Sequence, residues 1–388
     1  MISALAYDSG RTTGMRQTTT RYRHWITLPD LLVYSAHVCF DSAEQAFSYV
    51  KYDDQSSHPL LKLRMKLNPL ILGPAMIVAQ ATFIVAAHAE PLQTQGTEIL
   101  ADGNVRDPVP DSAKLKALVD DTRKKMIGLP GGTFEMGDWG SQVNADGLFF
   151  DSSPDSRPLH QVTLSGFSMG KYPVTYAEFD LFVAAMGLPR VNQSTFYRKF
   201  RKPNNAVGVS WQGAKDYCQW IGKQAGLPID LPTEAQWEYA ARSGGKRNLY
   251  PTDDGTRDDG RNVPSYEQRK AAGGLVEVGK FPPNPAGFHD FGAGIHEWTN
   301  DWYGADYYLK SSRNNPTGPD SGPGRVVRGN FGNIQMTFQR WHRPVEEETG
   351  TWILRPEQRG GPKREVPYTK YSAPSDHGFR CVINQVAP

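Results

Sequence analysis

The segment LPTEAQWEYAARSGG at residues 231–245 constrains the fold more than any other part of this chain, because it marks both ends of a short helix. Thr233 is a natural N-cap residue, and Gln236 three positions later completes a capping box. Gly244 and Gly245 stop the helix, since glycine readily adopts the left-handed backbone that follows a helix end. The segment therefore predicts a helix that begins after Thr233 and ends before the glycine pair.

The same segment has two faces at helical spacing. Trp237, Ala240 and Ala241 recur at i, i+3 and i+4 and form an apolar stripe. The pattern predicts an amphipathic helix that one tryptophan anchors in the core. The charged residues form a ladder on another face: Glu234, Glu238 and Arg242.

Composition is typical of a globular protein and excludes a general nucleic-acid binder. The 388 residues are 38% hydrophobic and carry a formal net charge of +2, so no broad attraction to polyanions follows. The 38 Gly, 29 Pro and 9 Trp favour a loop-rich fold pinned by aromatic side chains over a helix bundle. We expect a linker and a short helix over residues 90–125 and the main domain over residues 126–388.

The N-terminal part has the layout of a secretory signal peptide. A basic flank precedes an apolar run over residues 67–87, and the small-x-small triplet AHA at 87–89 follows as a cleavage site. We therefore expect residues 1–64 to be a non-native upstream extension, residues 65–89 to be the signal peptide, and the mature protein to be periplasmic or secreted. An uncleaved membrane anchor is the alternative, because the run is nearly long enough to span a bilayer. Prolines and polar residues inside the run favour cleavage, which leaves no stable membrane anchor.

Four motifs resemble the sulfatase-modifying-factor, or formylglycine-generating-enzyme, family. They are LPTEAQWEYAAR at 231–242, DFGAGIHEWTNDW at 290–302, RVVRGNF at 325–331 and GFRC at 378–381. The resemblance covers about residues 126–388. It implies the family's loop-rich α/β (α+β) fold, which is related in shape to C-type lectins.

The resemblance also implies a structural disulfide. Cys218 lies in a segment similar to the family's Y-C-x-W helix, and Cys381 lies in the segment similar to its closing G-F-R-C strand. An even pair of cysteines in an exported chain agrees with such a bond.

The family's oxidase chemistry is expected to be lost. Formylglycine-generating enzymes oxidise a substrate cysteine with two cysteines that follow the R-V-x-R-G-G-S-F strand and bind copper(I), a soft ion that prefers thiolates. With Phe331 as the anchor of the alignment, those two positions are Asn333 and Phe338. Neither residue is a soft ligand. We therefore expect that the protein binds no copper and that it is a pseudoenzyme with respect to cysteine oxidation.

Polar residues near those positions are the remaining catalytic candidates. His342 is able to act as a general base near neutral pH, although the sequence shows no partner for it. A metal pair of His296 and His342 lacks the usual H-x-H or H-x₃-H spacing. The full set of candidates is His342, Arg340, Asn330 and Glu297.

Calcium is the metal that the resemblance implies. The Glu297 carboxylate, with the carbonyls of Gly292, Ala293 and Ile295, keeps the pattern of one family site, and Asn262 keeps part of the other. The alternative is that Glu297 is a buried carboxylate satisfied by hydrogen bonds within the protein.

Two functions stay open on this basis. The first is a periplasmic protein that binds or masks a protein partner, as an accessory or immunity-type factor does, with the family's groove and the insertion at 344–373. The second is a cysteine-independent oxidoreductase in the maturation of an exported metabolite such as a siderophore. A stoichiometric partner in periplasmic extract favours the first function, and turnover of a small exported metabolite favours the second.

Overall fold

The computed structural model divides the chain into two units, residues 1–87 and 88–388. Among the described residues, no helix is long and apolar enough to cross a membrane. The expected upstream extension and signal peptide fall outside the described residues, except for the strands β1 (Ser48–Tyr49) and β2 (Lys62–Leu63). The structure describes residues 96–195, 197–291, 294–329, 336–345, 371–372 and 376–384, and also the backbone of the strands at 48–49, 62–63, 350–354 and 364–368.

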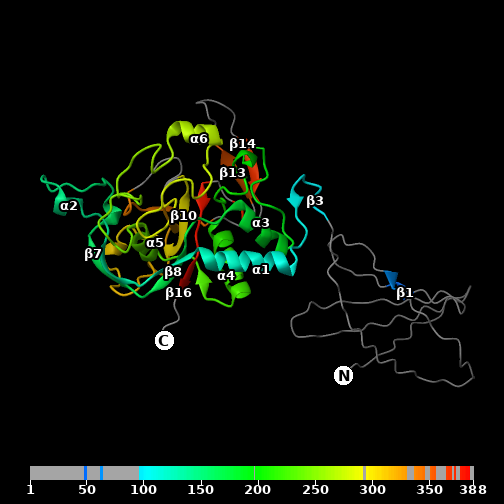
Figure 1. The fold of residues 1–388 in the computed structure, drawn as a ribbon, viewed down its shortest axis with the longest axis horizontal. Helices are drawn as coiled ribbons and strands as arrows, with labels where there is room; N and C mark the ends of the chain where they lie inside the picture. Colours follow the sequence, from blue (N-terminus) through cyan, green and yellow to red (C-terminus); the bar gives the residue numbers. More distant parts are fainter. Residues whose placement is uncertain are drawn as a thin grey trace, which may run out of the picture. The chain divides into compact units, whose positions relative to one another are not determined.

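One antiparallel sheet joins the beginning of the domain to its end. Strand β5 (Met126–Leu129) pairs with β8 (Phe167–Gly170), β8 pairs with β16 (Val382–Asn384), and β16 pairs with β9 (Ile229–Asp230). The last strand of the chain therefore lies inside this sheet, between two strands from much earlier in the sequence (Figure 1).

A second sheet carries most of the residues discussed below. Its order is β12 (Trp341–Arg343), β11 (Arg325–Arg328), β10 (His296–Trp302) and β15 (His377–Gly378). The first two pairings are antiparallel, whereas β10 and β15 are parallel. Four strands from separate segments of the chain are thereby brought into one layer.

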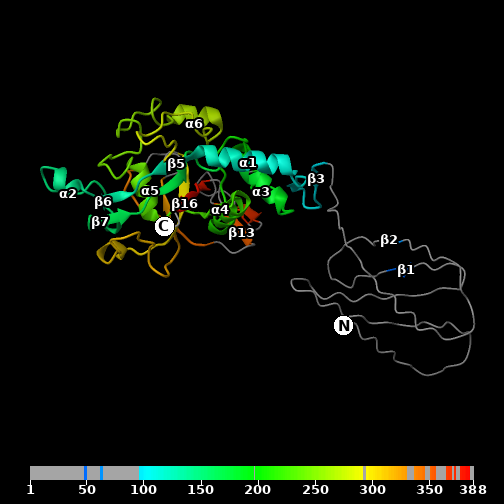
Figure 2. The same ribbon diagram turned by 60° about the horizontal axis from the view of Figure 1, so that its bottom comes forward.

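The remaining strands form small two-stranded sheets and the helices surround the two larger sheets. Figures 1 and 2 show α1, α3 and α4 on one side of the domain and α5 with the β6–β7 pair on the other. The remaining strands are β3 (Glu98–Ile99) with β4 (Val105–Arg106), β6 (Gly132–Met136) with β7 (His160–Leu164), and β13 (Gly350–Leu354) with β14 (Arg364–Tyr368). The helices are α1 (Ser112–Lys125), α2 (Gly140–Val143), α3 (Tyr176–Ala185), α4 (Trp211–Ala225), α5 (Glu234–Ala241) and α6 (Tyr266–Ala272), with short 3-10 turns at Pro154–Ser156, Arg198–Phe200 and Tyr307–Leu309.

The predicted helix start at Thr233 is confirmed, because Thr233 and Gln236 form a capping box at the start of α5. Two further helices also start with side-chain caps. Thr175 and Glu178 form a capping box at the start of α3. Asp111 caps α1 through the backbone N–H of Lys114. These caps are local, since each cap residue satisfies N–H groups that the first helical turn leaves free.

Helix α1 packs as part of the domain, although the sequence prediction placed residues 90–125 before it. Leu118 and Val119 are buried in the same apolar cluster as Trp298 and Cys218. The predicted disulfide is also present and joins Cys218 of α4 to Cys381, with Cα atoms 5.6 Å apart. It ties the α4 helix to the segment that leads into the central strand β16.

The amphipathic description of α5 is wrong, because every residue of this helix is buried. Its apolar side carries Trp237, which is 1% exposed in the second apolar cluster. Its charged side faces inward as well, with Glu234 2% and Glu238 0% exposed. The charged ladder is satisfied by arginines from other parts of the chain, which the sequence pattern did not reveal.

Four ion pairs around α5 form one buried network. Glu234 accepts two hydrogen bonds from Arg340, at 2.7 and 2.9 Å, and a third from Arg328 at 2.9 Å. Glu238 accepts from Arg328 at 3.0 Å and from Arg242 at 2.9 Å. Burial by itself would raise the pKa of Glu234, but Arg340 and Arg328 outweigh it and lower that pKa. Both carboxylates therefore have direct cationic partners inside the domain.

Asp301 at the edge of this network is a buried acid with a raised pKa. Its Oδ2 accepts a hydrogen bond from the backbone N–H of Glu234 at 2.8 Å. Burial, and then the negative charge of Glu234, raise its pKa to about 8. Asp301 is therefore expected to be protonated at neutral pH.

Removal of the disulfide is expected to destabilise the domain strongly. The bond closes a loop with a sequence separation of 163 residues, and the chain-entropy model assigns such a closure about 5 kcal/mol. We expect a Cys218→Ala/Cys381→Ala double variant to lose free energy of unfolding on this scale in denaturant titrations. Reduced wild-type protein should match it. Identical midpoints for oxidised and reduced protein would contradict the expectation.

The raised pKa of Asp301 predicts a pH-dependent stability. The native state keeps a proton that the unfolded state releases, so the free energy of unfolding falls as pH rises from about 4 to about 8. Asp301→Asn cannot ionise, so its free energy of unfolding should fall less over this interval. Thermal melts of both proteins at several pH values measure the difference, and parallel curves would show that Asp301 does not titrate there.

Candidate functional site

Phe338, which the sequence prediction assigned to the second lost cysteine position, is enclosed by aromatic side chains. Phe338 is 0% exposed, and its ring lies 5.1 Å from that of Trp139 and 6.2 Å from that of Phe150. We call these three residues the aromatic plug. The first position, Asn333, and the candidate Asn330 lie outside the described residues. Phe338 is therefore part of a well-packed apolar cluster.

Two of the proposed catalytic residues are held in buried ion pairs. Arg340 binds Glu234 in the network around α5, and its Nη1 also donates to the carbonyl of Asp155 at 2.6 Å. Glu297 accepts from Arg380 at 2.7 Å on each of its oxygens and from the indole of Trp237 at 3.0 Å. These contacts give both side chains a structural role in the domain.

The described residues do not fit the implied calcium sites well. Both oxygens of Glu297 face a guanidinium, so the positive charge that calcium would supply is already present. Asn262 directs its side-chain oxygen at the backbone N–H of Asp258, at 2.8 Å. Gly292 and Ala293 lie outside the described residues. Calcium binding at these residues stays a prediction, and no reaction step is assigned to the ion.

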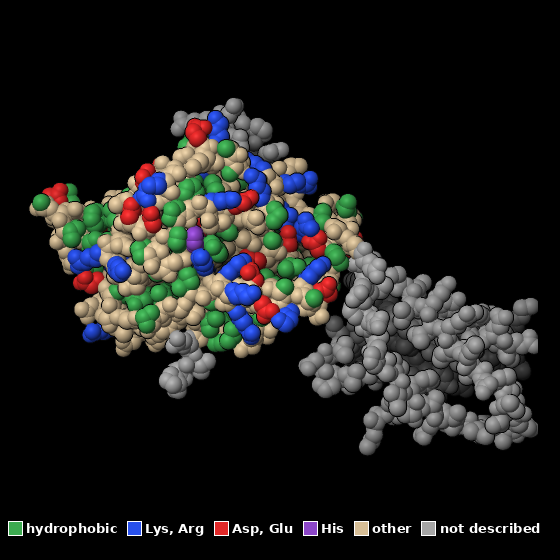
Figure 3. All heavy atoms as spheres, viewed as in Figure 1, with side chains coloured by type: hydrophobic (Ala, Val, Ile, Leu, Met, Phe, Trp, Pro, Cys, Tyr) green, Lys and Arg blue, Asp and Glu red, His purple; other side chains and the backbone are tan. Residues whose placement is uncertain are grey.

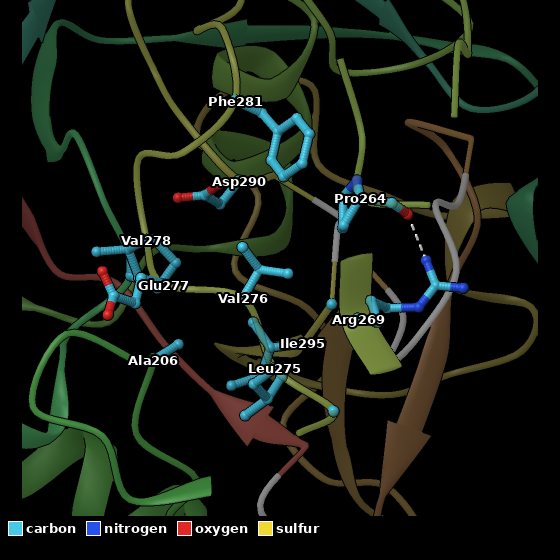
Figure 4. Close-up of a pocket in the computed structure, with 13 residues that line it drawn as sticks. Ala206, Pro264, Arg269, Leu275, Val276, Glu277, Val278, Phe281, Asp290 and Ile295 are labelled. Atoms are coloured by element: carbon cyan, nitrogen blue, oxygen red, sulfur yellow. Dashed lines mark hydrogen bonds between the residues drawn. The ribbon is translucent and has the colours of Figure 1, made fainter. Parts of the chain in front are cut away.

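The remaining calcium candidate, Ile295, lines a small cavity (Figure 4). Apolar side chains such as Val276 and Phe281 form much of its wall, and the Asp290 carboxyl lies among them. Asp290 accepts a hydrogen bond from the backbone N–H of Gly279 at 2.7 Å, and burial raises its pKa to about 6. Ile295, in the wall of this cavity, directly precedes strand β10, which begins at His296.

His342 does not meet His296. Its ring stacks on Tyr303 with a centroid distance of 4.3 Å, and the hydroxyl of Tyr303 donates to Asp155 at 2.8 Å. Burial, and then the nearby charge of Arg343, lower the pKa of His342. It is therefore mainly neutral at neutral pH, with a stacked aromatic ring as its nearest partner.

The structure instead joins His296 to His377, a residue that sequence reasoning missed. The two lie opposite each other in the parallel β10–β15 pairing, with ring centroids 5.7 Å apart. Arg343 at the end of β12 donates from Nε to His377 Nε2 at 3.0 Å and approaches His296 Nε2 with Nη2 at 3.4 Å. We call His296, His377 and Arg343 the His–Arg cluster. A histidine directly before the G-F-R-C motif was the only signal in the sequence.

Both imidazoles of the His–Arg cluster are neutral at physiological pH. Burial lowers the pKa of His296 to about 4, and His377 and Arg343 add to the shift. Burial, and then Arg343, lower the pKa of His377 to about 3. Neutral rings are what the contacts require, because a ring nitrogen that accepts from Arg343 carries no proton. Both histidines of the cluster are buried, whereas Arg343 is half-buried on β12, which pairs with β11.

Breaking the Glu297–Arg380 pair is expected to destabilise the domain. Glu297→Gln leaves Arg380 as an uncompensated buried charge, which typically costs about 3 to 5 kcal/mol. Denaturant titration with a chelator present measures the loss. Glu267→Gln on the exposed side of α6 is the control and should change the free energy of unfolding by less than about 0.5 kcal/mol. An equally small effect of Glu297→Gln would contradict the structural role.

The same proteins test the calcium prediction. A calcium-dependent rise in the wild-type melting temperature that Glu297→Gln loses would establish the ion at this site. Superimposable wild-type melts with calcium and with chelator would count against it.

Comparisons with known proteins agree with the fold. The model of the sulfatase-modifying factor enzyme 1-like domain matches residues 112–385. Formylglycine-generating enzyme from Streptomyces coelicolor is 30% identical over 257 residues, which cover 52% of this chain and 77% of that protein. The mouse enzyme is 28% identical over 257 residues, or 53% and 65% of the two chains. Serine/threonine-protein kinase pkn1 from Chlamydia pneumoniae is 31% identical over 224 residues, which cover 53% of this chain and 32% of that protein.

Among solved structures, PvdO from Pseudomonas aeruginosa has a TM-score of 0.50 and 22% identity, and the match covers 67% of this chain and 94% of PvdO. At this identity the likeness concerns the fold alone. The chain spans about a third of the length of the kinase relatives that it matches. The family match begins at the start of α1, which agrees with the packing of that helix in the core. The chain belongs to the sulfatase-modifying factor enzyme 1-like, or formylglycine-generating-enzyme-like, domain family.

Proposed function

We propose that this chain is an exported family member that has lost cysteine-oxidase chemistry and holds a protein partner, as an accessory or immunity-type factor does. The aromatic plug is the observation that carries the proposal. A fully buried Phe338 between two aromatic rings leaves no thiol and no open space for a copper ion at that position. Retention of the complete scaffold around it fits binding better than turnover.

An exposed apolar arm supports the choice of a protein partner. Helix α2 and the loop after it, residues 140–149, form this arm, which projects from the rest of the domain in Figure 1 and carries apolar side chains in Figure 3. Val143 is 54%, Leu148 62% and Phe149 40% exposed. Apolar side chains gathered on one exposed segment are typical of contact surfaces. The arm joins directly to Trp139 and Phe150 of the plug.

Export is part of the proposal and rests on the signal-peptide layout of residues 65–89. A periplasmic or secreted location also suits the disulfide, because such bonds persist in oxidising compartments.

The loss of oxidase chemistry is tested with a sulfatase-type peptide that contains the substrate cysteine. With copper(I) and oxygen, we expect no formylglycine by mass spectrometry. The Streptomyces coelicolor formylglycine-generating enzyme, under the same conditions, is the positive control. Any copper-dependent formylglycine yield above the enzyme-free background would refute the proposal.

Partner binding is tested by cross-linking and affinity capture from periplasmic extract. We expect one stoichiometric protein partner whose capture falls at least about tenfold in Leu148→Ser/Phe149→Ser, since each buried apolar side chain contributes roughly 1.5–3 kcal/mol. Met186→Ser, which changes an apolar side chain that is 52% exposed elsewhere, is the matched control. Equal capture by the arm variant and wild type would exclude the arm as the contact.

The His–Arg cluster favours a second function, a cysteine-independent oxidoreductase in the maturation of an exported metabolite such as a siderophore. Buried neutral histidines beside an arginine are residue types that bind small molecules through hydrogen bonds. Turnover of a small exported metabolite without any stoichiometric protein partner would select this function over the first.

A further inference from the structure

Two buried polar atoms beside the His–Arg cluster have no hydrogen-bond partner. They are Oδ1 of Asp376 and Nδ1 of the adjacent His377, whose side chains are 27% and 5% exposed. Buried polar atoms are nearly always paired, so each unpaired one requires an explanation. Asp376 Oδ1 is an acceptor, whereas the role of His377 Nδ1 depends on where the ring carries its proton.

The contacts fix which nitrogen of His377 carries the proton. Arg343 donates from Nε to His377 Nε2 at 3.0 Å, so Nε2 must be the acceptor. The ring proton is therefore on Nδ1, which becomes a buried N–H donor without an acceptor. His377 thus needs a ligand atom that accepts a hydrogen bond.

Arg343 has no carboxylate partner in the described part of the chain. Its three contacts are the two imidazole nitrogens of the cluster and the carbonyl of His342 at 3.2 Å. A guanidinium has five N–H donors, so two remain for a ligand. The four fully buried arginines each pair with a glutamate, which makes this half-buried arginine different from them: Arg242, Arg328, Arg340 and Arg380.

Asp376 lies near Arg343 without reaching it. The Asp376 carboxylate is 3.9 Å from His377 Nε2, the same atom that Arg343 contacts at 3.0 Å. The described contacts nevertheless include no ion pair between Asp376 and Arg343. A positive and a negative group therefore approach the same ring nitrogen without pairing with each other, and each keeps unused hydrogen-bonding capacity.

The geometry points to a binding site for the α-amino and α-carboxylate groups of a free amino acid, with the carboxylate on Arg343 and the ammonium group on Asp376. Such a zwitterion supplies an anion and a cation a few ångströms apart, which matches the two unpaired groups. A bridging water would supply hydrogen bonds but no charge. A carboxylate paired with a guanidinium forms charge-assisted hydrogen bonds, which are the stronger kind.

The site has an approach from solvent and a fixed place in the fold. Arg343 is only half-buried, and the Asp376 side chain is 27% exposed. Arg343 directly precedes the insertion at 344–373, and Asp376 follows it closely. The inference goes beyond the proposed function and does not depend on it, because neither the arm nor the aromatic plug supplies a contact.

Isothermal titration calorimetry on the full exported chain tests the inference, with glycine as the probe that carries only the two charged groups. We expect glycine to bind, and acetate, methylamine and N-acetylglycine each to bind at least about tenfold more weakly, because each lacks one of the two charges. Arg343→Gln and Asp376→Asn should each weaken glycine binding at least about tenfold. Arg257→Gln, at an exposed ion pair with Asp259, is the control and should leave it unchanged.

Glycine binding that is absent, or that both cluster variants retain, would overturn the inference. Equal affinity for glycine and acetate would also overturn it, because it would indicate a site for the carboxylate alone. Thermal melts of Asp376→Asn measure whether this variant is folded, and its partly exposed side chain predicts that it is. A loss of glycine binding by the folded variant is then a loss of the site and not of the fold. Failure of glycine binding leaves partner capture by the arm intact, so the two proposals fail separately.

Discussion

The bidentate pair between Glu234 and Arg340, with Arg328 as its third member, is the interaction on which the rest of the structure depends. It joins the start of α5 to strand β11 and to Arg340, which directly precedes β12. Buried ion pairs contribute little net stability compared with apolar packing, but breaking one is costly. The ion pairs of Glu234 fix the position of α5, because a misplaced α5 would leave several charges unpaired in the core. This explains why α5 is buried on all sides.

A second buried pair connects the two larger sheets. Glu297 at the start of β10 binds Arg380, which lies directly before Cys381 and the central strand β16. The disulfide joins α4 to the same segment, and the indole of Trp237 joins α5 to Glu297. The candidates Glu297 and Arg340 looked catalytic in the sequence because reactive and structural charges have the same residue types. Only their partners distinguish the two roles.

The described part of the domain combines the family's fold with a closed aromatic cluster. Capped helices, the disulfide and two buried ion-pair networks hold the domain together. Phe338 packs against Trp139 and Phe150 in an apolar cluster. The His–Arg cluster retains unpaired polar atoms at His377, and Asp376 has another directly beside it. Arg328 of the network around α5 also has one unpaired nitrogen, Nε, but its other nitrogens bind both glutamates of α5.

Local features of the sequence determined the helix starts at Asp111, Thr175 and Thr233, since a cap and the turn that it serves lie within a few residues. The motifs around 231–242 and 378–381 determined the family, and with it the disulfide. The partners of Glu234, the closure around Phe338 and the meeting of His296 with His377 were decided only by the tertiary structure. Each joins residues tens to more than a hundred positions apart, and strand pairing across that distance leaves no periodic signal in the chain. The charged side of α5 shows the limit most clearly, because a charged ladder has the same sequence pattern whether it faces water or buried arginines.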